Sequence, residues 1–247
     1  MNDQQKQDKR EECLYMAKLS EQTERFEEMV ANMKEVIKTT KELKDEERNL
    51  LSIAYKNSVG QRRTAWRALT VFEMKEKTQS TRFNETIDWY KKKIEQELQA
   101  ICVEILLIID KSLMPNSQQI ESKIFYLKMK GDYNRYLSEF THGTKKKEYM
   151  KRAEEAYLSA LEKLKADNSG FTKINPLLIG VALNCSVFYY EIKNDLQKAC
   201  DLAQTTFDEA LQDIQSIDED QYKDATTILQ LLNDNLTAWQ AELKEVF

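Results

Sequence analysis

The sequence contains few residues that interrupt helices and few that bind metals. Its 247 residues include five glycines, two prolines and a single histidine, His142, in the turn-like stretch FTHGTKKKEY. Long Glu-, Lys-, Leu- and Ala-rich stretches between so few breakers predict a nearly all-α protein. With one imidazole and no Cys-x-x-Cys pair, the chain lacks the usual ligands of a zinc site, so we expect no metal and no other cofactor.

Further absences narrow the class of protein. The cysteines are scattered without paired spacing, which favours reduced thiols in a helical core: Cys13, Cys102, Cys185 and Cys200. No run of about 18 apolar residues occurs, and the start MNDQQKQDKREEC is polar throughout. We therefore expect no membrane insertion, no secretion signal and a cytoplasmic location, with the nucleus left open as a second compartment.

Motifs of the common enzyme classes are also missing. The chain has no Gly-x-x-x-x-Gly-Lys-Ser/Thr loop, no dinucleotide fingerprint and no nucleophile elbow. Its 37 basic and 42 acidic residues leave a net charge of −5, whereas a nucleic-acid-binding protein normally has a broad basic face. The sequence therefore predicts no enzymatic activity and no nucleic-acid partner.

The apolar periodicity and its punctuation predict nine antiparallel helices joined by short turns. Pro115 and Pro176 mark two of the breaks, and Pro176 suits the first turn of a helix. The predicted helices span 9–23, 26–40, 45–77, 81–112, 119–141, 145–167, 176–193, 197–214 and 220–241. We expect one domain over 1–247, with a short polar N-terminal extension over about 1–9 and a short tail over about 241–247.

The most informative segment is NLLSIAYKNSVGQRRTAWR, residues 49–67, because it places cations along one predicted helix face. Steps of three, four, three and four residues separate Ile53, Lys56, Gly60, Arg63 and Arg67. This spacing keeps all five on one face, opposite Tyr55 and Trp66. Three cations around a glycine are unusual in a core and suit a face that brings a doubly charged anion close to the backbone. The alternative is a solvated basic face.

A second cationic element lies in ESKIFYLKMKGDYNRYLSEF, residues 121–140. Lys128 and Arg135 are seven residues apart and share a helix face, with Asp132 between them as a counter-charge and Tyr136 next to Arg135. Taken alone, this segment also fits a tyrosine-rich amphipathic helix whose charges point to water.

Both segments closely resemble the signature of the 14-3-3 family, whose members bind phosphoserine and phosphothreonine segments of other proteins. The resemblance covers about residues 15–240 and implies a cup-shaped, dimeric, all-α protomer with an amphipathic groove. The residues that match the family's phosphate pocket are Lys56, Arg63, Arg135 and Tyr136. A phosphate monoester carries about −1.5 to −2 charges at pH 7 and accepts paired hydrogen bonds from guanidinium groups. Clusters of arginines are a recognised means of binding phosphorylated motifs, and the 14-3-3 family is a standard example of this mode of recognition.

The other wall of the implied groove combines apolar stripes with single amides. Two stripes follow a three-to-four spacing: Leu183, Asn184, Val187 and Glu191, and Ile228, Leu231, Asn235 and Trp239. Singly, such an asparagine is more often a surface residue or makes an interhelical hydrogen bond. As a pair, the two amides suit an extended peptide backbone, to which each can donate and accept. The resemblance assigns these eight residues to the groove, together with Ile53, Arg67, Lys128 and Asp132.

The resemblance also implies a dimer formed by the N-terminal helices. It pairs Arg25 with Glu97 and Glu28 with Lys93 across a two-fold axis. Between these pairs it implies a small apolar centre with Leu19 and Tyr90, and Thr23 is presented by the same segment as Leu19. Exposed ion pairs contribute only about 0–1 kcal/mol each, so burial of this centre must carry the association. The alternative is that these residues make ordinary contacts within one chain.

Several positions depart from the family pattern, among them Ala65, Asn134, Cys185, Thr227 and the stretch 175–178. The whole pattern nevertheless predicts a non-enzymatic adaptor that clamps phosphorylated client proteins, as a homodimer or as a heterodimer with another isoform. A scaffold of tetratricopeptide type is the main alternative, although no period near 34 residues recurs. A helical enzyme with a carboxylate site is a third interpretation, which no motif supports.

Overall fold

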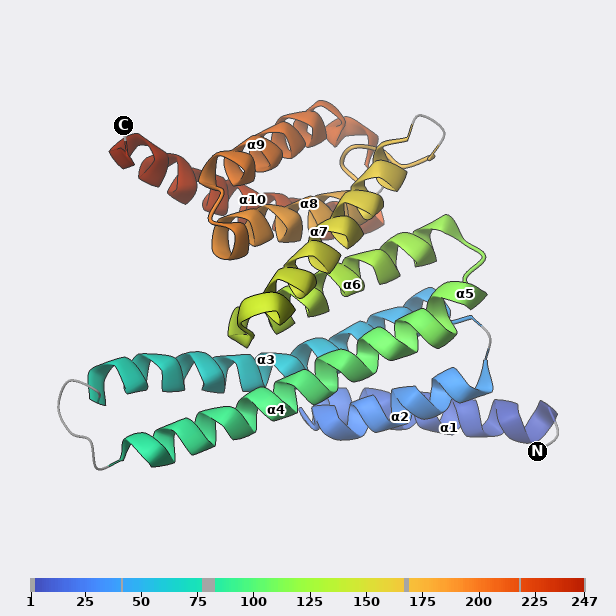
Figure 1. The fold of residues 1–247 in the computed structure, drawn as a ribbon. Coiled ribbons are helices and arrows are strands. Elements are labelled where there is room, and N and C mark those ends of the chain that lie inside the picture. The colour runs from blue at the N-terminus through green and yellow to red at the C-terminus, as the bar shows by residue number, and fades with distance from the viewer. Residues whose placement is uncertain (1–2, 41, 77–82, 167–168, 218, 247) are drawn as a thin grey trace. The chain divides into compact units, whose positions relative to one another are not determined.

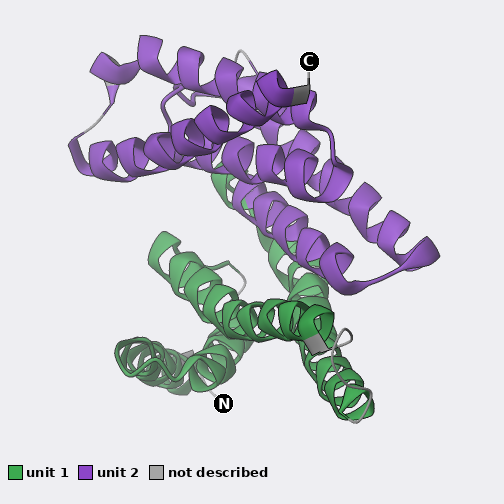
Figure 2. Cartoon of the chain, turned by 90° about the vertical axis from the view of Figure 1, so that its left-hand side faces the viewer, with its two compact units in different colours: residues 1–122 green, residues 123–247 purple. Residues whose placement is uncertain are grey.

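The computed structural model describes residues 3–40, 42–76, 83–166, 169–217 and 219–246 (Figure 1). The chain divides into two compact units, residues 1–122 and 123–247 (Figure 2), and each is described by itself. Within these described ranges the regular structure is helical and no strand occurs. The predicted all-α class is therefore confirmed.

Unit 1 is built from the N-terminal helices. They are α1 (Asp3–Gln22), α2 (Phe26–Thr39), α3 (Asp45–Glu76) and α4 (Asn84–Ile108), which continues through a π-helical turn (Ile109–Leu113) into the short α5 (Met114–Asn116). Helix α1 packs on α2, and α3 packs on α2 and α4. Figure 1 shows α4 running beside α3 over much of its length.

Unit 2 contains the C-terminal helices. They are α6 (Ile120–Phe140), which starts at the unit boundary, α7 (Gly143–Lys165), α8 (Pro176–Phe188) with a π-helical turn (Tyr189–Lys193), α9 (Leu196–Gln212), a 3-10 turn (Ile214–Ser216) and α10 (Glu219–Val246). Helix α8 packs on α7, α9 and α10, so it is the central helix of this unit.

All nine predicted helices are present in the described part of the chain; the one predicted over 81–112 corresponds to α4 and most of the π-helical turn, and the short α5 lies beyond it. The helices predicted at the two termini are too short. Helix α1 already begins at Asp3, inside the predicted polar extension, and α10 continues to Val246, through the predicted tail. Both segments consist largely of good helix formers, and the amide of Gln4 donates to Asp8 one turn later at 2.6 Å. Polarity alone does not prevent a helix from extending into water.

Local signals fix the ends of α8, which carries part of the predicted groove. The side-chain oxygen of Asn175 accepts the N–H of Leu177 at 2.9 Å, and Pro176 occupies the first turn, where it loses no helical hydrogen bond. After the π-helical turn, Asn194 adopts a left-handed φ of 52°, which ends the helix, and Asp195 caps α9. Local interactions therefore fix where α8 begins and where its π-helical extension ends.

The start of α3 is anchored in a similar way. Glu47, in its first turn, accepts the backbone N–H of Lys44 at 2.8 Å, which is half of a capping box. Arg10 of α1 holds the same carboxylate with two bonds of 2.6 and 3.0 Å. The helix that carries the cationic stripe is thereby tied to α1.

The buried faces agree with the predicted periodicity. Helix α3 buries Leu51, Tyr55 and Val59, opposite the predicted stripe. In unit 2, buried residues of α7, α8, α9 and α10 form one hydrophobic cluster, in which the rings of Tyr157 and Phe188 lie 6.0 Å apart. Each unit therefore has its own core.

The four cysteines are buried free thiols, as predicted. None of the described helices is long and apolar enough to cross a membrane. In the same parts of the chain, no three His, Cys, Asp or Glu side chains are grouped so that they could hold a metal ion.

Candidate functional site

The cationic stripe of α3 lies on an accessible surface of that helix. Lys56 and Arg67 are exposed, and Ile53, Gly60 and Arg63 are half-buried. A Cβ atom added at Gly60 would meet no atom of the described residues within 4 Å, so the described surface next to this glycine is open. The stripe can therefore receive a ligand without any rearrangement of the core of unit 1.

The neighbouring arginine, Arg62, has a different role. Its guanidinium donates to Glu97 at 3.0 Å, to Glu27 at 2.9 Å and to the carbonyl oxygen of Ser58 at 3.0 Å. It therefore ties α3 to α2 and α4 and points away from the stripe. Helical spacing therefore assigned the two consecutive arginines correctly: Arg63 lies on the same helix face as Lys56, and Arg62 does not.

In unit 2, the carboxylate of Asp132 gathers polar groups from three helices. Its Oδ2 accepts from Lys128 at 2.9 Å, and its Oδ1 accepts from the hydroxyl of Tyr157 at 2.6 Å and from the amide of Asn184 at 2.7 Å. A terminal nitrogen of Arg135 lies 3.8 Å from the same Oδ1. Asp132 is only 7% exposed, so one buried carboxylate compensates two cations.

Arg135 is buried beside Tyr136, its predicted partner in phosphate binding. Its exposed fraction is 6%, and its guanidinium carbon lies 4.7 Å from the centre of the Tyr136 ring. Its Nε donates to the hydroxyl oxygen of Tyr157 at 3.3 Å, and a terminal nitrogen lies 3.9 Å from Glu139. The aromatic ring and the carboxylates hold the guanidinium in a fixed plane.

These contacts set the charge states of the cluster. Burial acts to raise the pKa of Asp132, but the charges of Lys128 and Arg135 outweigh it and lower that pKa below its ordinary value. For Arg135, burial acts to lower the pKa, but Tyr157 and Tyr136 help to raise it above its ordinary value. Burial, with the charge of Asp132, raises the pKa of Tyr157 well above its ordinary value. At neutral pH Asp132 is therefore ionised, Arg135 is charged and Tyr157 is a neutral phenol.

The predicted apolar wall is partly accessible. Leu231 is 51% exposed, and the half-buried members of the wall are Leu183, Val187 and Ile228. A Cβ atom added at Gly180 would lie 3.7 Å from Cε of Lys128 and 4.0 Å from Cδ1 of Ile228. Lys128 and Ile228 therefore approach the same glycine of α8, which brings the cationic cluster near the apolar wall within unit 2.

The polar members of this wall differ in their surroundings. Asn184 makes the interhelical bond to Asp132, which is the alternative that the sequence leaves open. Asn235 is half-buried and Glu191 is exposed. Trp239 is 5% exposed and stacks on Tyr190 at 5.0 Å between ring centres, so its ring belongs to the core of unit 2. A role for Trp239 in the groove stays a prediction.

Tyr157 is not among the site residues that the sequence predicts. It lies in α7 among buried alanines, and this pattern indicates a core position. One signal was available, since a tyrosine on a fully buried stripe needs a hydrogen-bond partner for its hydroxyl. The sequence does not say which helix supplies that partner.

Comparison with known proteins decides the family. A family model described as 14-3-3 protein matches residues 16–240. Over 240 residues the chain is 47% identical to the 14-3-3-like protein GF14 epsilon of Arabidopsis thaliana, covering 97% of this chain and 93% of the relative. It is 50% identical over 234 residues to the checkpoint signal transducer rad24 of Schizosaccharomyces pombe, covering 94% and 86%. It is 48% identical over 231 residues to the 14-3-3 protein beta/alpha of Xenopus tropicalis, covering 94% and 93%. The chain belongs to the 14-3-3 family.

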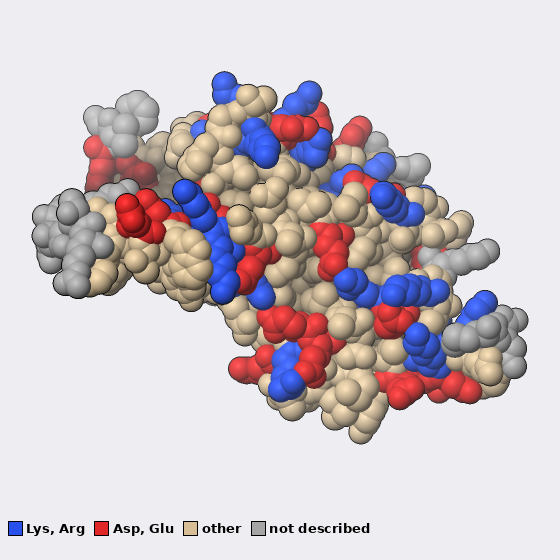
Figure 3. Space-filling model, turned by 60° about the horizontal axis from the view of Figure 1, so that its bottom comes forward, with Lys and Arg blue, Asp and Glu red and all other residues tan. Residues whose placement is uncertain are grey.

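Family membership settles the class of function. 14-3-3 proteins are adaptors in signalling, without enzymatic activity, and the binding of phosphorylated segments of other proteins is their general function. The interpretations as a tetratricopeptide scaffold and as a helical enzyme are thereby excluded. Figure 3 shows one face of this 14-3-3 protein, on which the coloured acidic and basic side chains are interspersed.

The predicted dimer residues of this 14-3-3 chain are accessible. Leu19 is 43% and Tyr90 is 46% exposed. The other predicted members at this surface are half-buried or exposed: Thr23, Arg25, Glu28, Lys93 and Glu97. Within the single chain, however, Arg25 forms an ion pair with Glu28, and Glu97 accepts from Arg62. The predicted pairs across a two-fold axis would have to replace or share these contacts.

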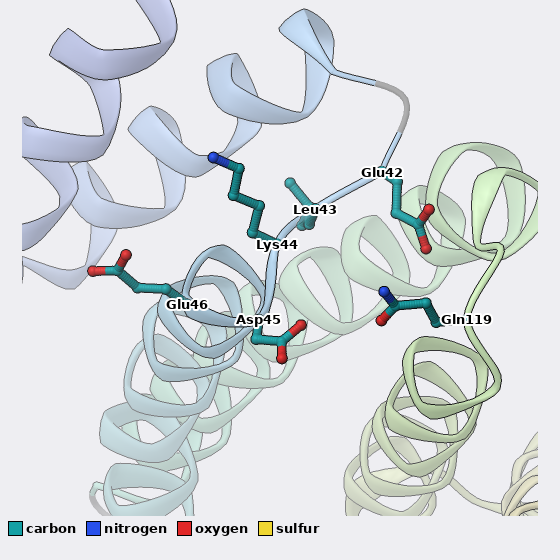
Figure 4. Close-up of a pocket in the computed structure, with 6 residues that line it drawn as sticks. All are labelled: Glu42, Leu43, Lys44, Asp45, Glu46 and Gln119. Carbon is teal, nitrogen blue, oxygen red and sulfur yellow. The ribbon is translucent and has the colours of Figure 1, made fainter.

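A cavity of about 500 Å³ in unit 1 lies at the turn between α2 and α3 (Figure 4). Its lining consists of Glu42, Leu43, Lys44, Asp45, Glu46 and Gln119. Three carboxylates and one ammonium make this cavity unsuitable for a phosphate, and its lining includes none of the predicted site residues. The cavity is therefore separate from the candidate site.

Proposed function

We propose that this 14-3-3 protein binds the phosphate of a phosphoserine or phosphothreonine with four side chains: Lys56, Arg63, Arg135 and Tyr136. The observation that carries the proposal is the setting of Arg135. This guanidinium lies beside the ring of Tyr136, and the carboxylate of Asp132, 3.8 Å from a terminal nitrogen, compensates its charge. An arginine fixed in this way is ready to bind an anion and loses little side-chain entropy when it does so.

The second half of the pocket comes from the stripe on α3. Lys56 supplies a compact charge and Arg63 a planar set of donors, next to the open surface at Gly60. Bringing these two groups and the α6 cluster to one phosphate is part of the proposal. This arrangement requires residues 1–247 to form a single domain, which we also propose.

The segment that flanks the phosphate binds along α8 and α10. Leu183, Val187, Ile228 and Leu231 pack against its side chains, and the amides of Asn184 and Asn235 bind its backbone. Half-exposed apolar side chains next to the cationic cluster support this assignment. Ile53, Arg67, Lys128, Asp132, Glu191 and Trp239 complete the predicted groove.

The protein acts as a dimer through Leu19, Tyr90 and the charged residues around them. Two exposed apolar side chains among charges of both signs support a self-complementary surface. A homodimer is the simplest form, and a heterodimer with another isoform uses the same surface. We place this adaptor in the cytoplasm, with access to the nucleus.

The pocket is tested by titrating a singly phosphorylated peptide into charge variants. Lys56→Glu or Arg63→Ala is expected to weaken binding by about 10- to 150-fold, because each charge-assisted contact contributes about 1.5–3 kcal/mol. The helical circular-dichroism signal is expected to persist. Lys92→Ala, which removes an exposed lysine of α4, is the matched control and is expected to bind normally. Unchanged affinity in both Lys56→Glu and Arg63→Ala would overturn this assignment.

A further inference from the structure

Tyr157 is a fully buried residue that contacts two members of the α6 cluster and has no part in the proposed pocket. Its exposed fraction is 0%. Its hydroxyl donates to Oδ1 of Asp132 at 2.6 Å and accepts from Nε of Arg135 at 3.3 Å. A phenol can donate once and accept as well. The carboxylate and the guanidinium are themselves 3.8 Å apart, too far for a direct hydrogen bond, so the hydroxyl connects them.

The ring reaches this position because the residue next to Asp132 is a glycine. A Cβ atom added at Gly131 would lie 2.4 to 2.7 Å from three ring carbons of Tyr157, closer than any real contact. Gly131 lies in the middle of α6, where glycine costs about 1 kcal/mol relative to alanine. Helix α6 is therefore locally less stable at Gly131, where the absence of a side chain leaves room for the ring of Tyr157.

The bond to Tyr157 determines which donors of Arg135 remain available. A guanidinium has five N–H groups, one on Nε and four on the terminal nitrogens. Among the described residues, Nε bonds to Tyr157, whereas the terminal nitrogens have carboxylates only at 3.8 and 3.9 Å. With Nε occupied, the edge formed by the two terminal nitrogens is the one left to make paired bonds to two phosphate oxygens.

We propose that Tyr157 is a positioning residue for phosphate recognition, which holds the Nε of Arg135 so that the terminal nitrogens stay free for the phosphate. This inference rests on the proposed function of Arg135. The simpler interpretation is that Tyr157 only fills the core, where its ring packs on Phe188. The two interpretations differ because the first needs the hydroxyl and the second needs only the ring.

Tyr157→Phe separates them, since it keeps the ring and removes the hydroxyl. Calorimetric titration with a singly phosphorylated peptide is expected to show binding about 5- to 30-fold weaker than wild type. Tyr189→Phe is the matched control, because Tyr189 is equally buried and its hydroxyl donates to Glu154 at 3.1 Å. This control is expected to bind like wild type. Wild-type affinity in Tyr157→Phe would overturn the inference.

A double-mutant cycle tests whether the effect passes through Arg135. Lysine has no Nε–H group, so in an Arg135→Lys background the change Tyr157→Phe is expected to alter affinity by less than about twofold. An equal loss in both backgrounds would show a general structural effect and overturn the inference. If the wild-type protein does not distinguish phosphorylated from unphosphorylated peptide, the proposed function itself fails, which is a different outcome.

A measurement on the folded wild-type protein covers the case in which Tyr157→Phe does not fold. Nitrogen-15 NMR of the peptide-free protein is expected to show a slowly exchanging Nε–H signal for Arg135, identified by its loss in Arg135→Lys. This signal is expected to persist when the phosphorylated peptide binds. A rapidly exchanging Nε–H would contradict the bond to Tyr157.

Discussion

Asp132 shows how much one buried carboxylate can determine. Removing its charge leaves Lys128 without this counter-charge and Arg135 with only the carboxylate of Glu139, at 3.9 Å, and it weakens the acceptor for Tyr157 and Asn184. Breaking a buried pair in this way typically costs about 3–5 kcal/mol, because a desolvated charge stays behind. The same contacts that organise the cations are therefore expected to stabilise unit 2.

Asp132→Asn is expected to lower stability in a pH-dependent manner. The pKa of Asp132 is lower in the folded protein than the value of about 3.9 for an unfolded chain. Its ionised form therefore stabilises the fold fully above about pH 4, and this contribution is lost as the pH falls through the folded-state pKa. Urea unfolding is expected to show a gap of about 3–5 kcal/mol between wild type and variant at neutral pH. The gap is expected to narrow below about pH 4. Asp208→Asn, at an exposed site on α9, serves as control, and a gap independent of pH would contradict the account.

The residues of the site were predictable to different degrees. Spacing along one helix identifies Arg63 rather than Arg62, and it places Lys128, Asp132 and Arg135 together, because contacts three or four residues apart follow from helix geometry. Contacts between helices do not follow from it. Tyr157 reaches Asp132 from a helix 25 positions away, through the space left at Gly131. The periodicity of apolar residues in the sequence does not indicate such a contact between two helices.

At the scale of helices, α10 carries both a core face and an exposed apolar position that we propose for binding. Leu232 is fully buried, whereas the adjacent Leu231 is 51% exposed. Consecutive residues of a helix point about 100° apart, which accounts for the contrast. An exposed leucine next to half-buried apolar neighbours contributes little to folding and remains available to a ligand.

Leu231→Asp is expected to weaken binding of a long phosphorylated peptide by about 5- to 50-fold, because the aspartate must lose its hydration against the peptide. Thermal unfolding is expected to change little, given the exposure of this side chain. Val187→Asp is expected to weaken binding in the same way. Leu211→Asp, at a leucine of α9 that is 44% exposed, is the matched control. Normal binding by both wall variants would show that the wall is wrongly assigned, even if free phosphoserine still competed at the pocket.

Helix positions were predicted well and helix ends less well. The proline signal at Pro176 located the start of α8 correctly, because the preference of proline for a first helical turn is local. The termini were underestimated, because polar residues with high helix propensity continue a helix without any apolar stripe to reveal it. Sequence patterns of this kind detect burial more readily than they detect helicity.

At the scale of the whole molecule, self-association depends on surfaces that one chain leaves exposed. Leu19 and Tyr90 remain accessible, while Arg25, Glu28 and Glu97 already form ion pairs within the chain. Exposed pairs of this kind contribute only about 0–1 kcal/mol. The apolar pair is therefore expected to dominate the free energy of association.

Exchanging Arg25→Glu and Glu28→Arg together reverses the charges at the proposed dimer surface while keeping an ion pair within the chain. Combined with Leu19→Gln, this exchange is expected to give monomers in sedimentation experiments. These monomers are expected to keep normal affinity for a short singly phosphorylated peptide, and to lose the avidity of about 10²–10⁴ for a doubly phosphorylated client. A similar exchange of Glu148 and Arg152 on α7 is the control. A wild-type protein that sediments only as a monomer at micromolar concentration would contradict the dimer.

The most direct test of the central claim compares one peptide in two states. Calorimetric titration with an Arg-Ser-x-Ser-x-Pro peptide, phosphorylated or unphosphorylated at its second serine, isolates the contribution of the phosphate. The phosphorylated form is expected to bind at least about 100-fold more tightly, since its oxygens accept several charge-assisted hydrogen bonds. Equal affinity for the two forms would contradict the assignment of Lys56, Arg63, Arg135 and Tyr136 as a phosphate pocket.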